Sequence, residues 1–64
     1  MNEELVIELL EKLRNGTISE YHVNKEEFLV VREVIVKRED FKHFRGIAQR
    51  GGGVIYQYLE NPRS

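Results

Sequence analysis

Apolar residues recur every three or four positions at the start of the chain, which is the spacing of one face of an α-helix. This stripe comprises Leu5, Val6, Leu9, Leu10 and Leu13. Asn2 is a suitable N-cap for such a helix, and Gly16 is a suitable end because glycine adopts the left-handed conformation without penalty. The pattern predicts an N-terminal amphipathic helix.

The spacing of apolar residues changes twice in the middle of the chain. Residues 17–23 lean towards a short strand, and Asn24 to Glu27 has the form of a capping box, which predicts a helix from Lys25. Residues 28–36 have helical apolar spacing but are rich in β-branched side chains, so a strand is the alternative. Length and the capping box favour the helix.

The last third is expected to hold a helix and then a strand. Phe41, Phe44 and either Ile47 or Ala48 fall at helical spacing, which predicts a helix over residues 40–50. Three glycines at 51–53 end it, and residues 54–59 are the clearest strand in the sequence. If residues 44–49 are extended instead, the glycines form the turn of a hairpin.

These elements predict a single α+β domain over residues 1–64, with fraying expected at 1–2 and 61–64. Its parts are an N-terminal amphipathic helix, a short strand, one or two central helices and a C-terminal strand or hairpin. This order is that of a winged helix-turn-helix, an analogy that does not fix function. A small all-α bundle is the main alternative, and a more sheet-rich fold follows if residues 28–36 are a strand.

The amino-acid composition indicates the compartment of the protein and the kind of partner to expect. The chain has no cysteine, which excludes disulfides and thiolate metal sites and favours the cytoplasm. No apolar run is long enough to span a bilayer, so no membrane association is expected. Residues 1–30 carry seven Glu against three basic residues, a charge of −4, and residues 31–64 carry +3. This asymmetry suggests a polar partner.

Catalytic chemistry has little support. His22 lies near Ser19 without a third group, and the glycine run precedes a strand, the reverse of the order in phosphate-binding loops. Glu39, Asp40 and His43 would share a helix face, but an ordinary helix pair explains them better than a metal. We therefore expect no enzyme activity, cofactor, metal or small-molecule substrate.

One binding hypothesis rests on the basic segment. On a helix over residues 40–50, several polar side chains would share one face and could contact phosphates or base edges. They are Lys42, Arg45, Gln49 and Arg50. Because the whole chain is not basic, nucleic-acid binding is the alternative function.

The leading hypothesis concerns the last strand. It is apolar on both faces, although so short a chain cannot bury both against one core. Its candidate contact residues are Ile55, Tyr56, Tyr58 and Leu59. Tyrosine is well suited to interfaces. The sequence thus predicts a small regulatory protein that binds a protein partner or a second copy of itself, as a homodimer.

Overall fold

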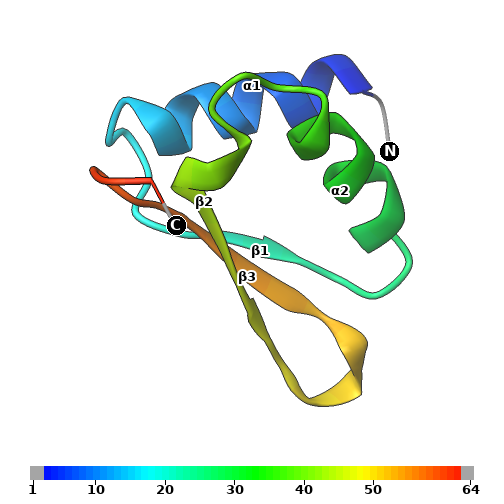
Figure 1. The fold of residues 1–64 in the computed structure, drawn as a ribbon. Helices are drawn as coiled ribbons and strands as arrows, with labels where there is room; N and C mark the ends of the chain where they lie inside the picture. Colours follow the sequence, from blue (N-terminus) through cyan, green and yellow to red (C-terminus); the bar gives the residue numbers. More distant parts are fainter. Residues whose placement is uncertain (1–2, 63–64) are drawn as a thin grey trace.

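The computed structural model describes residues 3–62 and shows two helices packed on one face of a three-stranded antiparallel sheet (Figure 1). The helices are α1 (Glu3–Arg14) and α2 (Phe28–Val36), and the strands are β1 (Tyr21–Val23), β2 (Phe44–Ala48) and β3 (Val54–Tyr58). Short 3₁₀ turns, η1 (Phe41–His43) and η2 (Arg50–Gly52), precede β2 and β3. The predicted α+β class is confirmed, and the all-α alternative is wrong.

Helix α1 forms as its apolar stripe predicts. Val6, Leu10 and Leu13 are buried, and the acidic first turn and basic last turn suit the helix dipole. The helix ends at a turn in which Gly16 has a φ of 83°, the left-handed conformation that glycine tolerates. The expected N-cap, Asn2, lies outside the described residues.

Helix α2 replaces the strand considered for residues 28–36, but it begins three residues later than the capping box predicts. The side-chain oxygen of Asn24 accepts a hydrogen bond from the Glu27 amide at 3.0 Å, as in a capping box. The Asn24 carbonyl accepts from the same amide, which closes a turn over residues 25–27. The first α-helical bond is the one from the Val31 amide to the Glu27 carbonyl.

The predicted helix over residues 40–50 is wrong. Helical geometry there is limited to the short turn η1 and to Arg50 at the start of η2, and residues 44–48 pair as strand β2 with β3. Two facts favour the strand: Gly46 lowers helix propensity, and β3 offers a complete ladder of partners from Ala48↔Val54 to Phe44↔Tyr58. Long-range pairing therefore overrides the helical spacing of the phenylalanines.

The alternative of a glycine-turned hairpin is confirmed. Gly51 and Gly52 have φ values of 85° and 92°, and the Gln49 amide donates to the Gly53 carbonyl at 2.8 Å. The hairpin tip projects away from both helices (Figure 1). The sheet order is β1-β3-β2, so β3 is central and both other strands are edges.

The core lies between the sheet and the two helices, and α1 packs against α2, β1 and β3. Where a winged helix-turn-helix has its third helix, the described chain has only the short η1 turn. The β2 end of the inner sheet face is therefore left without a helical cover. Within residues 3–62, no helix is long and apolar enough to cross a membrane.

Candidate binding groove

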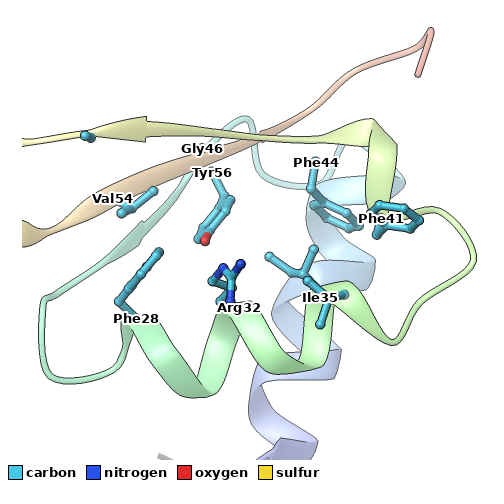
Figure 2. Close-up of a pocket in the computed structure, with 10 residues that line it drawn as sticks. Phe28, Arg32, Ile35, Phe41, Phe44, Gly46, Val54 and Tyr56 are labelled. Atoms are coloured by element: carbon cyan, nitrogen blue, oxygen red, sulfur yellow. The ribbon is translucent and has the colours of Figure 1, made fainter. Parts of the chain in front are cut away.

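A groove lies between α2 and the β2–β3 hairpin, with a volume of about 480 Å³. We call it the α2–β2 groove (Figure 2). It is lined by Phe28, Arg32, Ile35 and Val36 of α2, Phe41 of η1, Phe44, Gly46 and Ala48 of β2, and Val54 and Tyr56 of β3. Its volume is within the range of ligand-binding clefts, and its lining side chains are apolar apart from Arg32 and the hydroxyl of Tyr56.

The α2 wall follows from helical spacing. Phe28, Arg32 and Ile35 are separated by four and three residues, so they lie on one face, and Figure 2 shows all three directed towards the strands. Ile35 is buried, whereas Val36 at the end of this wall is 51% exposed. Phe41 across the groove is 38% exposed. The groove thus leaves large apolar groups in contact with water.

Tyr56 forms the middle of the strand wall. Its side chain is buried, and this burial raises the pKa of its hydroxyl, against a smaller opposing effect of the nearby Arg32 charge. Gly46, its cross-strand partner, has no side chain, and the ring fills the vacant space. A Cβ at position 46 would lie 3.1 Å from Cε1 of Tyr56 and 3.2 Å from Cγ1 of Val54. The glycine therefore lets the ring lie across β2.

Arg32 is the charged residue of the groove lining, and no acidic residue accompanies it there. Within residues 3–62 it forms no ion pair or side-chain hydrogen bond with a carboxylate. Figure 2 shows its guanidinium next to the Tyr56 ring. The groove consequently offers a cation, with five N–H donors, among apolar side chains.

Arg38, two residues after the end of α2, is in the opposite situation. It donates to Oδ1 of Asp40 at 2.8 Å and also to Glu11 of α1, while Arg14 lies 3.8 Å from Oδ2 of Asp40. Hydrogen bonds from Arg38 hold the pKa values of Asp40 and Glu11 below their usual range. The guanidinium also lies 5.6 Å from the centre of the Phe44 ring. This Arg38 cluster fixes the loop before η1 to α1.

The four nucleic-acid candidates do not share a helix face. Lys42 lies in η1 near the Phe41 ring, and Arg45 projects from the outer face of β2. Gln49 and Arg50 lie in the hairpin turn, where the Gln49 side chain donates to the Ile47 carbonyl at 3.3 Å. The structure spreads these residues along β2 and its turn.

The four partner-binding candidates are also separated. Tyr56 and Tyr58 face the helices, while Ile55 is on the outer sheet face and Leu59 follows the strand. Tyr58 stacks on His43 with ring centres 5.1 Å apart and meets Phe44 edge-on. Of the four, Tyr56 alone lines the α2–β2 groove.

Two of the three residues considered for metal binding, Asp40 and His43, have structural partners. Asp40 belongs to the Arg38 cluster. Nδ1 of His43 lies 2.7 Å from the Leu59 carbonyl oxygen, and since a carbonyl only accepts, this nitrogen carries the proton. Within residues 3–62, no three His, Cys, Asp or Glu side chains come close enough to hold a metal.

Comparison with known proteins adds a family. The model of the YkzS-like proteins matches residues 3–57. The chain belongs to this family. The matched range runs from the start of α1 to the penultimate residue of β3, so it includes every residue of the groove. No curated protein and no solved structure gives a significant match.

Sequence reasoning missed Phe28, Arg32 and Gly46 as site residues. A signal was present in the spacing: Phe28, Arg32 and Ile35 form one helical line, with a charge between two large apolar groups. An arginine between apolar residues on one helix face indicates a binding site only when the element that faces it is known. That wall is the hairpin, whose strand β2 forms from residues predicted to be helical.

Proposed function

We propose that this protein is a non-enzymatic interaction protein that binds a protein partner in the α2–β2 groove. The observation that supports it is the combination of exposed apolar walls with the unpaired Arg32. Exposed apolar groups around a concave site are typical of surfaces that a partner covers. The proposal moves the contact surface from the whole last strand to its inner face, where Tyr56 meets α2.

We further place this binding in the cytoplasm. Secreted domains of this size usually depend on disulfides, and the sequence has no cysteine. The function proposed is therefore regulatory contact between cytoplasmic proteins.

A pair of photo-crosslinking variants tests the groove. Val36 and Leu29 are both apolar residues of α2 with exposed side chains, 51% and 67%, but only Val36 lines the groove. A photoreactive amino acid is placed at one or the other position, and the protein is irradiated in its native cells. We expect a discrete protein adduct from position 36 that position 29 does not give. Equal labelling from both positions, or no adduct from position 36, would contradict the proposal.

The nucleic-acid alternative keeps one supporting feature, the basic hairpin with Arg45 on β2 and Arg50 at the tip. An amide-resolved NMR titration with duplex DNA separates the two functions, because phosphate contacts weaken steeply with salt. If DNA shifts residues 45–53 at low salt and the shifts fade as salt rises, the protein is a nucleic-acid binder. Amides that stay unchanged leave the protein partner as the proposed ligand.

A further inference from the structure

The outer edge of β2 presents unused backbone groups next to the groove. At the two ends of the β2–β3 ladder, the Gln49 amide donates to the Gly53 carbonyl at 2.8 Å and the Leu59 amide to the His43 carbonyl at 2.6 Å. In an antiparallel pair, hydrogen-bonded residues alternate with non-bonded ones. The odd-numbered residues of β2 therefore bond to β3, and the even-numbered residues point their amides and carbonyls outwards.

Two residues carry these outward groups in the middle of the edge. Gly46 and Ala48 are both exposed, and no hydrogen bond from another described residue reaches their amides or carbonyls. An edge with free donors and acceptors is a template on which an extended segment can pair. The opposite edge, β1, is shorter, with three residues against five. The β2 edge is thus the larger open edge of the sheet.

The same edge borders the α2–β2 groove. Side chains on a strand alternate between faces, so Phe44, Gly46 and Ala48, which line the groove, share the inner face of β2. A strand added to β2 would place every second side chain on this inner face as well, above α2. The residue opposite Gly46 would meet the Tyr56 ring and approach Arg32. Backbone pairing and side-chain contact would then occur at one site.

The basic residues at the groove indicate the charge of the segment that would bind there. Arg32 is the charged residue of the lining, and Lys42 extends over the Phe41 ring at the η1 end of the groove. Arg32 is exposed, so a carboxylate that enters the groove could reach its guanidinium and form a charge-assisted hydrogen bond. A basic side chain in the same place would be repelled.

We propose that the groove binds an extended segment of a partner protein, which adds to the β2 edge as a fourth strand and places an acidic side chain on Arg32. This inference rests on the proposed function and names how the partner is held. The partner is recognised by three features: an extended backbone, alternating apolar side chains, and a carboxylate at the position opposite Gly46.

The test uses synthetic peptides and amide hydrogen exchange of the intact protein. The main probe is a capped peptide of alternating valine and threonine, long enough to cover β2, with glutamate at the central groove-facing position. Companion probes carry glutamine or lysine there, and a fourth probe is an amphipathic helical peptide of matched apolar content with one glutamate. We expect the glutamate strand to bind about tenfold more tightly than the lysine strand. On binding, the amides of Gly46 and Ala48 should exchange about tenfold more slowly.

Two arginine variants give the matched control. Arg32→Gln removes the cation of the groove, whereas Arg45→Gln removes an exposed arginine from the opposite face of the sheet. We expect Arg32→Gln to remove the preference for glutamate over glutamine and Arg45→Gln to preserve it. An equal effect of both variants would show general charge attraction and would overturn the assignment of Arg32.

Other outcomes separate this inference from the proposed function. If the helical peptide binds the groove while Gly46 and Ala48 exchange as before, strand addition is wrong and the groove remains a binding site. If no strand peptide binds but position 36 gives its adduct, strand addition is again wrong. If the peptides and the crosslink both fail, both proposals are wrong. If the Gly46 amide exchanges more slowly as protein concentration rises, with no peptide present, a second copy of the chain occupies the β2 edge. That result would overturn the proposal that a different protein binds there.

Discussion

Arg38 and Arg32 are six residues apart, and their surroundings show how the packing against α1 differs from the α2–β2 groove. Arg38 is held by carboxylates of α1 and of the following loop and lies against Phe44, so its side chain is mostly buried and paired with two acidic groups. Arg32, six residues earlier, faces a groove with apolar walls and forms no ion pair within residues 3–62. The first arginine connects parts of the fold, and the second is available to a ligand.

The difference follows from what covers the sheet. Helix α1 lies over β1 and β3 and buries Val6, Leu10 and Leu13 with almost no exposure. Beside β2, η1 is too short to form a comparable layer. A small domain has a limited core, so it cannot bury every apolar side chain. Two of the exposed large apolar side chains, Val36 and Phe41, line the groove, whereas Leu5, Ile7 and Leu29 lie outside it. A ligand in the groove would therefore remove part of the exposed apolar area from water.

The largest effect expected is loss of a side chain under α1. Leu10 is completely buried, and Leu10→Ala should lower the free energy of unfolding by about 2–5 kcal/mol. Since a domain of this size has a stability on the order of 3–5 kcal/mol, much of the variant should be unfolded at 25 °C. Urea unfolding followed by circular dichroism measures this. The matched change Leu29→Ala, at a residue that is 67% exposed, should alter stability by less than about 0.5 kcal/mol. Similar losses in the two variants would show that α1 does not define the core.

A second pair of variants compares the arginines themselves. Arg38→Met removes the donor shared by Asp40 and Glu11 and leaves the part-buried Asp40 carboxylate with only Arg14 at 3.8 Å. We expect a loss of about 1–2 kcal/mol in the free energy of unfolding. Arg32→Met removes no ion pair, so its effect should stay within about 0.5 kcal/mol. If Arg32→Met proves as destabilising as Arg38→Met, Arg32 has a structural role and is not a free binding group.

The pH dependence of stability gives a smaller and separate test of the Arg38 cluster. Hydrogen bonds from Arg38 lower the pKa of Asp40 below its usual 3.8 and that of Glu11 below its usual 4.5. A carboxyl with a lowered pKa in the folded state stabilises the fold above its unfolded pKa. That contribution is lost as pH falls through the folded value. Stability of the wild type should therefore drop from about pH 4.5 downwards, and Arg38→Met should drop less. Parallel acid profiles would mean that these pairs contribute nothing to folding.

The fold was largely predictable because most of its elements are encoded locally. The stripe of α1, the turn at Gly16 and the β-branched and aromatic run of residues 54–58 each indicate a local feature without help from distant residues. The exception is residues 44–48. Their phenylalanine spacing suits a helix, and they become a strand because β3 supplies partners six to fourteen residues away. A pairing of that kind cannot be seen in a local window.

The site was less predictable for the same reason. Tyr56 was chosen as a contact residue, and it does line the groove, but Ile55 lies on the outer sheet face and Tyr58 stacks on His43 outside the groove. The basic residues were grouped by a helix that does not form. Arg32 becomes a candidate only when the hairpin is placed opposite α2. Its spacing relative to Phe28 could be read from the sequence, but its lack of a carboxylate partner could not.

The smallest expected effect tests whether the groove is truly open. In a close-packed core, a new Cβ 3.1 Å from an aromatic carbon would usually cost about 1–3 kcal/mol. At position 46 the atoms to be displaced belong to the Tyr56 ring, which borders the groove and has free volume beside it. Replacing glycine in a strand also reduces the entropy of the unfolded chain, which favours folding. We therefore expect Gly46→Ala to change the free energy of unfolding by less than about 0.5 kcal/mol, with the Tyr56 ring moved towards Arg32 in NMR contacts between the two side chains. A loss above about 2 kcal/mol would mean that the ring cannot yield, and the groove would then be a rigid hollow with no room for an added side chain.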